Sequence, residues 1–158
     1  MNILEASAAD AAEILALQKL AYLSEARIYN DDNIPPLTQT FEELTADFSQ
    51  KIFLKAVQDG RIAGSVNGFM EDGRCHIGRL MVHPDLQGRG IGTRLMTAIE
   101  RRFADAQAWE LFTGELSEKN IRLYERLGYR IVRKEPFEGS PFAIVIMRKT
   151  AEEERRKG

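Results

Sequence analysis

The sequence has 158 residues, of which 44% are hydrophobic and 29% charged, proportions typical of one globular domain with a buried core. Its formal net charge of −2 gives no overall positive field for binding nucleic acid. Cys75 is the only cysteine, so neither an intrachain disulfide nor a cysteine metal site is expected. The longest apolar run, residues 142–147, is far shorter than the roughly 20 residues of a membrane span, and no signal-peptide pattern opens the chain. We therefore expect a cytoplasmic protein that binds neither membrane nor nucleic acid.

Two helices are predicted in the first third of the chain. A capping box at Ser7 is followed by apolar residues at helical spacing, which predicts one helix over residues 8 to about 26. A second capping box starts a short helix over residues 40–48. Between them, residues 29–39 are largely polar and contain Pro35-Pro36, which we expect to forbid helix. This segment is predicted to be an exposed loop that is free to carry specificity.

Strand signals follow in succession. Asp59-Gly60 is a strong two-residue hairpin signal, and Asp72-Gly73 marks another tight turn. Because tight turns join antiparallel neighbours, we predict an antiparallel meander. Its strands are residues 52–57, 61–70 and 74–82.

The remainder of the chain alternates between helix and strand. Apolar residues four apart predict a helix over residues 90–104, and Ser117 caps a later helix that Gly128 ends. The remaining predicted strands are residues 108–113, 129–134 and 142–148. We predict an α/β (α+β) fold in residues 1–150: a mixed, mostly antiparallel central sheet flanked by about four helices, with one parallel pair where helix 90–104 crosses over. Residues 151–158 are predicted to be a charged, solvated tail.

A glycine-rich turn between a strand and a helix is the sharpest chemical signal. In residues 87–93 (Gln-Gly-Arg-Gly-Ile-Gly-Thr) the glycines let the backbone approach an anion, and a helix N-terminus follows at once. This arrangement predicts a phosphate cradle. A Walker loop and a dinucleotide fingerprint both require other spacings, and the preceding hairpins do not fit a nucleotide-binding βαβ unit.

The spacing Gln-x-x-Gly-x-Gly, preceded by Leu80-Met81-Val82-His83-Pro84, resembles the acyl-coenzyme A loop of the GNAT N-acetyltransferase superfamily. The segment Asn120–Tyr129 (NIRLYERLGY) is similar to that superfamily's later motif. The resemblance covers residues 3 to 148 in element order and implies a GNAT-like acyl-coenzyme A N-acyltransferase fold with acetyl-coenzyme A as co-substrate. The cofactor-binding residues it implies are Leu80, Met81, Val82, Gln87, Gly88, Arg89, Gly90, Ile91, Gly92, Thr93 and Asn120.

The resemblance also implies a reaction: an acetyl group passes directly from the thioester to an amine in a ternary complex. It assigns polarisation of the thioester carbonyl to a backbone N–H of residues 80–82. Tyr124 is implied to be the acid that protonates the departing thiolate. Asn120 lies one helical turn earlier, where it can contact the cofactor arm or orient Tyr124.

The sequence does not decide which group accepts the proton of the amine. His76 stands where some family members carry a glutamate, but it alternates in phase with Leu80 and Val82 and could equally be a structural histidine. Glu115 is a second candidate, and the amine could enter already deprotonated. Cys75 could suggest a covalent route, although a buried small hydrophobe is the commoner role of such a cysteine. No residue spacing indicates a metal site.

The acceptor is expected to be a primary amine of a small molecule or peptide. Tyr22, Tyr29 and Asp31 are the predicted acceptor-binding residues, and acidic Asp31 and Asp32 would favour a cationic amine. The alternative for these acids is a solvated turn. A non-catalytic acyl-coenzyme A sensor with the same fold is the rival function. Residues 142–147, with Phe137, could form the edge of a homodimer or complete the core.

Overall fold

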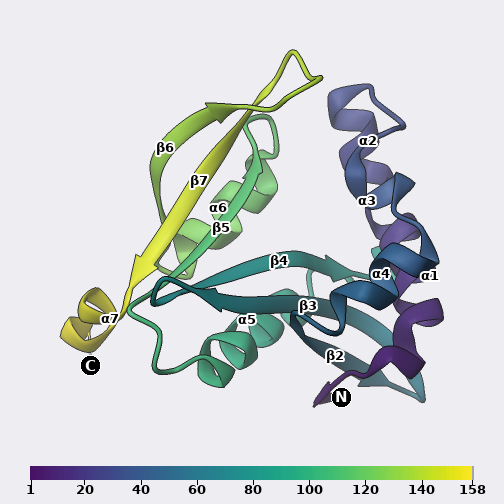
Figure 1. Cartoon of the computed structure of the whole chain (residues 1–158), viewed down its shortest axis with the longest axis horizontal. Coiled ribbons are helices and arrows are strands. Elements are labelled where there is room, and N and C mark those ends of the chain that lie inside the picture. Colours follow the sequence, from purple (N-terminus) through teal and green to yellow (C-terminus); the bar gives the residue numbers. More distant parts are fainter. Residues whose placement is uncertain (158) are drawn as a thin grey trace.

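The computed structural model describes residues 1–157 and contains one seven-stranded sheet in the order β1-β2-β3-β4-β5-β7-β6 (Figure 1). Its strands are β1 (Asn2–Glu5), β2 (Ile52–Gln58), β3 (Arg61–Glu71), β4 (Arg74–Val82), β5 (Ala108–Gly114), β6 (Arg130–Pro136) and β7 (Ala143–Thr150). Every neighbouring pair is antiparallel except β4 and β5, which are parallel. The predicted mixed sheet, its meander and its parallel pair are therefore confirmed.

The parallel pair is short, and this feature shapes the molecule. β4 and β5 are paired only where Arg74–His76 faces Ala108–Glu110. Beyond these residues the two strands separate, and Figure 1 shows them diverging from this crossing point. In their later halves, β4 and β5 therefore make no backbone hydrogen bonds to one another.

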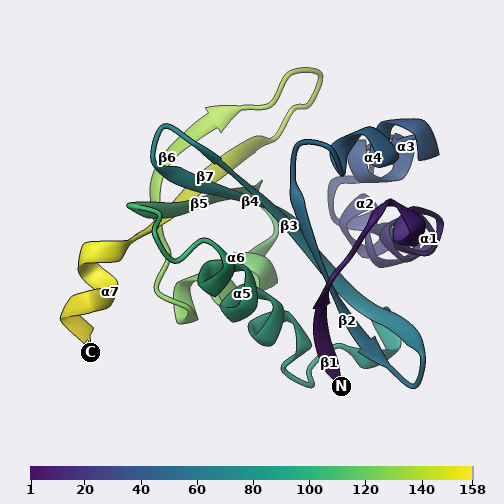
Figure 2. The same cartoon turned by 60° about the horizontal axis from the view of Figure 1, so that its bottom comes forward.

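Helices cover both faces of the sheet. The covering helices are α1 (Ala11–Ala21), α2 (Leu23–Tyr29), α3 (Pro35–Thr38), α4 (Phe41–Asp47), α5 (Ile91–Arg102) and α6 (Glu118–Arg126), and a last helix, α7 (Ala151–Lys157), follows β7. Neighbouring residues of β2 show the two faces: Phe53 belongs to a buried cluster with Ile14 of α1, whereas Leu54 belongs to the cluster that contains Leu95 of α5. Figure 2 shows α1–α4 gathered on one side and α5 and α6 on the other.

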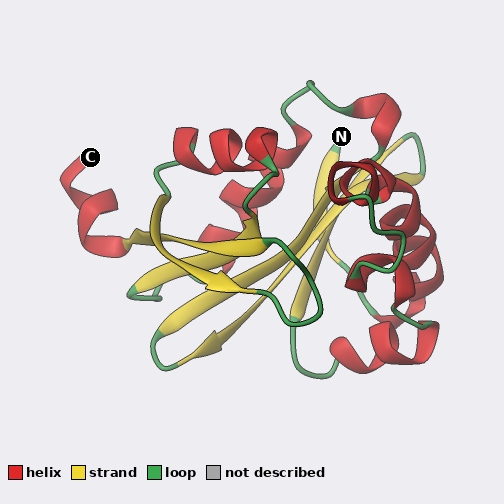
Figure 3. Cartoon of the chain, turned by 90° about the horizontal axis from the view of Figure 1, so that it is seen from above, coloured by secondary structure: helices red, strands yellow, loops and turns green. Residues whose placement is uncertain are grey.

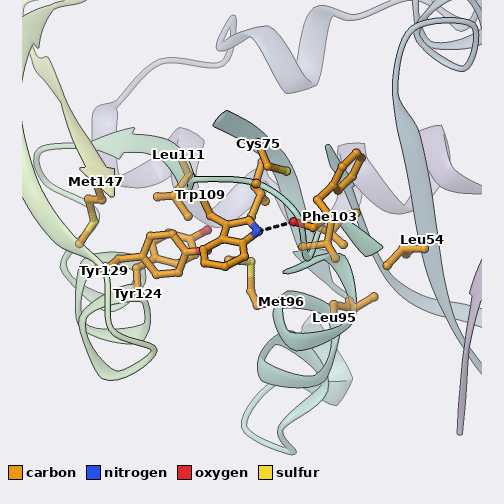
Figure 4. Close-up of a cluster of buried hydrophobic side chains, with 14 of the residues drawn as sticks. Leu54, Cys75, Leu95, Met96, Phe103, Trp109, Leu111, Tyr124, Tyr129 and Met147 are labelled. Carbon is orange, nitrogen blue, oxygen red and sulfur yellow. Dashed lines mark hydrogen bonds between the residues drawn. The ribbon is translucent and has the colours of Figure 1, made fainter. Parts of the chain in front are cut away.

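The larger core cluster lies under α5 and α6 (Figure 4). Leu95 and Met96 of α5 are fully buried there, next to Trp109 of β5. The indole N–H of Trp109 donates a hydrogen bond to the backbone carbonyl of Phe103 (3.2 Å), which closes the end of α5 against the sheet. This cluster fixes α5, and with it the glycine-rich turn that precedes it.

Three details of the helices differ from the sequence predictions. The single helix over residues 8–26 is wrong, because a 3₁₀ turn precedes α1 and the chain breaks at Tyr22 before α2 begins. Pro35 and Pro36 do not forbid a helix, because they occupy the first turn of α3. Backbone N–H groups in the first turn make no hydrogen bond within the helix, so the missing N–H of a proline costs nothing there. Together with α7, these differences make the number of helices larger than the predicted number of about four.

The charged C-terminal segment, predicted to be a solvated tail, forms the helix α7. No residue of α7 is buried, and Figure 3 shows the helix projecting beyond the sheet. Thr150 accepts a hydrogen bond from the backbone N–H of Glu153 (3.1 Å), and Arg130 pairs with the Glu153 carboxylate. These local contacts anchor the first turn of the helix; Gly158 lies outside the described residues.

β7 is an internal strand, which corrects the idea that residues 142–147 form a dimer edge. It pairs with β5 on one side and β6 on the other, and Val145 and Met147 lie in the core. The edges of the described sheet are β1 and β6. A homodimer joined through sheet edges would therefore use one of those strands.

Candidate active site

A large cavity, called the main cavity below, opens where β4 and β5 separate. Its volume is about 790 Å³, and its walls come from α2, the segment that leads into α3, the later halves of β4 and β5, α6 and the β6–β7 hairpin. Three of the predicted residues on α1–α2 and the following loop, Tyr22, Tyr29 and Asp31, line it, as do Asn120 and Tyr124 of α6. The structure thus brings the predicted acceptor residues and the predicted acid to one cavity.

A bulge in β4 shapes one wall of this cavity. Arg79 has a left-handed backbone (φ 51°), and the pairing of β3 with β4 shifts between Ser65 and Asn67. The break at Tyr22 faces this bulge, since its hydroxyl donates a hydrogen bond to the carbonyl of Leu80 (3.2 Å). Burial raises the pKa of Tyr22 to about 12, so this donor keeps its proton at neutral pH.

The bulge also corrects the predicted alternation along β4. Leu80 and Val82 pack toward the core under α5, whereas His76 lies on the opposite face, where its ring stacks on Phe69 (centroids 5.1 Å apart). An extra residue in the strand reverses the side of every residue after it. His76 therefore does not share a face with Leu80 and Val82.

Tyr124 lies at the inner wall of the main cavity. Its side chain is 8% exposed and its ring meets Tyr129 edge-on (centroids 6.1 Å apart; Figure 4). Burial is the main cause that raises the pKa of the Tyr124 hydroxyl above its usual value. Within residues 1–157 this hydroxyl makes no hydrogen bond, and it is not sealed from the cavity. It is a neutral proton donor without an internal partner.

A polar network ties α2 to the start of α6 beside the main cavity. The carboxylate of Glu25 accepts hydrogen bonds from Ser117 Oγ (2.6 Å) and Asn120 Nδ2 (3.1 Å). The Tyr29 hydroxyl lies 2.6 Å from Ser117 Oγ and accepts from the backbone N–H of Leu116 (3.0 Å). Asn120 is thus turned toward Glu25. Sequence reasoning missed Glu25, because nothing near it along the chain indicates that it meets α6.

Gly114 makes room for this network, and its replacement tests how tightly α2 is held. A methyl group at Gly114 would overlap the Tyr29 hydroxyl and ring. We expect Gly114→Ala to lower the free energy of unfolding by about 1–3 kcal/mol, the usual cost of overpacking, measured by urea denaturation. In a Tyr29→Ala background the same change should cost almost nothing. An equal cost in both backgrounds would show that Tyr29 is not the obstacle.

The glycine-rich turn lies outside the main cavity, exposed at the N-terminus of α5. Gly88 and Gly90 have positive φ (78° and 82°), and no atom lies within 4 Å of where their Cβ would be. Gly90 is the N-cap of α5, so the first backbone N–H groups of that helix have no helical acceptor. Among the predicted cofactor-binding residues, the side chains of Met81 and Ile91 are buried in the core, and any contact they make uses the backbone.

The two predicted bases lie outside the main cavity. His76 lines a smaller neighbouring pocket of about 180 Å³. The carboxylate of Glu115 lies at the base of the β6–β7 hairpin, where it accepts a hydrogen bond from the backbone N–H of Ala143 and forms an ion pair with Lys134 (2.7 Å). The hydrogen bond from Lys134 is the first cause of the lowered pKa of Glu115.

Cys75 is fully buried in the core, and burial raises the pKa of its thiol to about 12. The thiolate needed for a covalent route is therefore scarce at neutral pH. We expect Cys75 to resist alkylation in the folded protein, monitored by mass spectrometry, and Cys75→Ala to retain turnover. Rapid modification that stops turnover would contradict this expectation.

Residues 1–157 contain neither a cluster of metal-ligating side chains nor a helix fit to span a membrane. These residues hold no group of three or more His, Cys, Asp or Glu side chains placed to bind a metal ion. None of their helices is both long and apolar enough to span a membrane.

Comparison with known proteins decides the family. Residues 14–129 match the sequence model of the acetyltransferase (GNAT) family. The chain belongs to that family. Among curated relatives, the UPF0157 protein YqkA of Bacillus subtilis is 32% identical over 120 residues, which are 76% of this chain and 34% of YqkA. The uncharacterized N-acetyltransferase MJ1530 of Methanocaldococcus jannaschii is 32% identical over 102 residues, 61% of this chain and 65% of the relative. The chain thus spans less than two thirds of the length of these relatives.

Solved structures agree with the GNAT fold. The PaiA N-acetyltransferase of Thermoplasma acidophilum, solved in complex with coenzyme A, superposes with a TM-score of 0.80 at 19% identity and covers 95% of this chain and 99% of that one. The ribosomal-protein-S18-alanine N-acetyltransferase of Escherichia coli gives a TM-score of 0.78 at 15% identity, covering 95% and 93%. The predicted GNAT-like fold is confirmed.

Proposed function

We propose that this protein transfers an acetyl group from acetyl-coenzyme A to a primary amine of a small molecule or peptide, by direct attack in a ternary complex. The amine nitrogen bonds to the acetyl carbon, the carbon–sulfur bond breaks, the thiolate gains a proton and the amine loses one. The observation that carries this proposal is the main cavity, which opens between the separated strands and has the unpartnered Tyr124 hydroxyl in its wall.

The chain's residues fit coenzyme A in two places. The open space above Gly88 and Gly90, beside free N–H groups of α5, suits a pyrophosphate, with Gln87, Arg89 and Thr93 around it. The separated edges of β4 and β5 leave backbone groups, including those of residues 80–82, for the strand-like pantetheine arm. When bound, acetyl-coenzyme A supplies the activated acyl group.

Tyr124 is the proposed acid. Its raised pKa keeps the hydroxyl protonated throughout the neutral range, so the proton is present when the thiolate leaves. The Tyr124 hydroxyl donates no hydrogen bond within the described residues, so it breaks none when it gives its proton to the thiolate. Asn120, which bonds to Glu25 and lies 3.5 Å from Thr113 Oγ1, is proposed to hold this wall in place rather than to react.

Glu25 is the proposed proton acceptor for the amine, because it lies in the cavity that holds Tyr124 whereas His76 lies in the neighbouring pocket. We expect Glu25→Gln to lower kcat/KM for the amine about 100-fold at neutral pH. Raising the pH toward 10 deprotonates the amine itself and should restore most of the loss. His76→Gln is the matched control. A larger loss for His76→Gln, recovered at high pH, would assign the role to His76 instead.

The proposed function is tested by incubating the protein with acetyl-coenzyme A and a panel of amines, with free thiol release and acetylated product measured together. We expect amine-dependent release, and tight titration of acetyl-coenzyme A with no heat from ATP or NAD. Binding of acetyl-coenzyme A without transfer to any amine would favour the non-catalytic sensor. Absence of binding by a folded sample would remove both functions.

A further inference from the structure

The small pocket beside the main cavity, called the sheet pocket here, lies on the face of the sheet opposite α5. His76 and Phe69 face each other across β4 and β3 and form part of its wall. The sheet pocket shares Lys51, Asn67 and Gly78 with the main cavity. It is therefore a side chamber next to the point where the strands separate, which is where an acceptor would meet the thioester.

Lys51 is a half-buried cation without a counter-ion. It lies in the connection between α4 and β2, and its Nζ sits 5.6 Å from the centre of the Phe69 ring. Within residues 1–157 its Nζ makes neither an ion pair nor a hydrogen bond. The face of the Phe69 ring offsets part of the hydration that the ammonium loses. The ring supplies no negative charge, so the position of Lys51 favours an anionic ligand.

Asn67 is a second unsatisfied donor at the same place. Its side chain is 2% exposed, and its buried Nδ2 has no hydrogen-bond partner within residues 1–157. It lies on the same face as Gly78, its partner residue in β4, and both line the two hollows. Buried amide donors are nearly always satisfied. A ligand oxygen that enters between the hollows would complete this one.

Glu110, the one carboxylate that lines the sheet pocket, is already neutralised. It is 7% exposed and its oxygens pair with Arg148 (2.7 Å), Arg74 (3.2 Å) and Arg133 (3.9 Å). Burial alone would raise its pKa, but the hydrogen bond and charge of Arg148, helped by the other arginines, hold the pKa below its usual value. Glu110 therefore neither repels an anion here nor serves as the counter-ion of Lys51.

Three carboxylates line the main cavity: Glu25, Asp31 and Glu138. Glu25 accepts from Ser117 and Asn120, and Asp31 accepts from the backbone N–H of Asn33 (2.8 Å). Asp32 does not line the main cavity. Within residues 1–157 none of the three lining carboxylates makes an ion pair, so the main cavity presents mostly negative charge beside Arg79, which suits an ammonium group. In the sheet pocket the charged group without an ion pair is Lys51, which is positive.

We infer that the acceptor amine carries a carboxylate group, which the sheet pocket binds through Lys51 and Asn67. The inference rests on the proposed function. A pocket of about 180 Å³ holds a carboxylate with a few carbon atoms, so the acceptor class is an amino acid, or a peptide that presents a carboxylate close to its amine. The amine then lies toward Gly78, at the separation of the strands.

Matched acceptors test the inference: L-phenylalanine, L-phenylalaninamide and phenethylamine, and the same series built on methionine. We expect kcat/KM for the acids to exceed that for their amides at least tenfold. Lys51→Met, which keeps the length of the stem, should remove this preference and leave the amides unchanged. Lys19→Met, an exposed lysine of α1, makes the same change in charge and should have no effect. Amides that react as well as acids would overturn the inference while the proposed function stands.

A measurement without turnover separates the two ideas. In the protein saturated with coenzyme A, the side-chain amide signals of Asn67, assigned with Asn67→Ser, are followed by NMR. We expect 3-phenylpropionate to shift them and 3-phenylpropionamide to leave them in place, with no shift in Lys51→Met. This result without any acetylated amine would keep the carboxylate site and reject the transferase. An equal response to both probes, or none to either, would overturn the carboxylate site.

Discussion

Replacing Gly90 with glutamate is expected to abolish the binding of acetyl-coenzyme A, with at least a 100-fold rise in Kd measured by isothermal titration. The residue has φ +82°, which L side chains rarely adopt, and it is the N-cap of α5. A carboxylate there would place a negative charge where the pyrophosphate is proposed to lie, at the positive end of the helix dipole. Strain and repulsion would act together on the same few N–H groups.

Gly60→Glu supplies the matched control for this experiment. Gly60 also has a positive φ (75°) and open space around its Cβ position, but it lies in the β2–β3 turn. The backbone strain and the added charge are therefore equivalent, and only the position differs. We expect Gly60→Glu to bind acetyl-coenzyme A like the wild type. Equal losses in both variants would mean that Gly90 acts on folding and not on the ligand.

The fold was largely predictable because its signals are local. The two-residue turns and the glycines at element ends act within a few residues, and they placed the meander, α5 and α6 within two residues of their observed bounds at most ends. The parallel pair followed from a general rule, since a helix that crosses over joins parallel strands. None of these steps needed contacts between distant segments.

The features that the sequence did not reveal depend on distant contacts. The chain breaks at Tyr22 where its hydroxyl meets Leu80, 58 residues away. The bulge at Arg79 follows Gly78, and a single glycine within a strand is only a weak sign of a bulge, yet the bulge decides which face carries Leu80 and Val82 relative to His76. Periodicity within one helix or strand cannot reveal either feature, because each is fixed by what lies opposite.

The candidate site shows the same division. The resemblance to the GNAT superfamily indicated Tyr124 and the glycine-rich turn, which lie in contiguous motifs. Glu25 and Lys51 belong to no motif. They are recognised as site residues only in the folded chain, where α2 contacts the start of α6 and the α4–β2 connection contacts the sheet. Sequence motifs therefore indicated the acetyl donor side, whereas the acceptor side needed the three-dimensional arrangement.

Replacing Tyr124 with phenylalanine is expected to lower kcat by about 100-fold or more, the usual contribution of a general acid, and to leave the Kd of acetyl-coenzyme A unchanged. The change removes one hydroxyl that lines the main cavity, and within the described residues it breaks no hydrogen bond. We therefore expect the free energy of unfolding to stay within about 0.5 kcal/mol of the wild type. Stopped-flow or steady-state thiol release, together with urea denaturation, measures both quantities.

Two neighbouring tyrosines serve as controls that show whether the lower kcat of Tyr124→Phe comes from the lost proton donor or from a change in structure. The Tyr129 hydroxyl donates to Glu100 (2.7 Å), so Tyr129→Phe should cost stability, about 1 kcal/mol, with little change in kcat. Tyr22→Phe loses its bond to the Leu80 carbonyl and should act on the wall of the main cavity, raising the KM of the amine. Only Tyr124→Phe should separate a lost kcat from preserved stability and cofactor binding. If its kcat equals that of the wild type, the proton reaches the thiolate from another donor, and the unpartnered hydroxyl in the cavity wall serves binding alone.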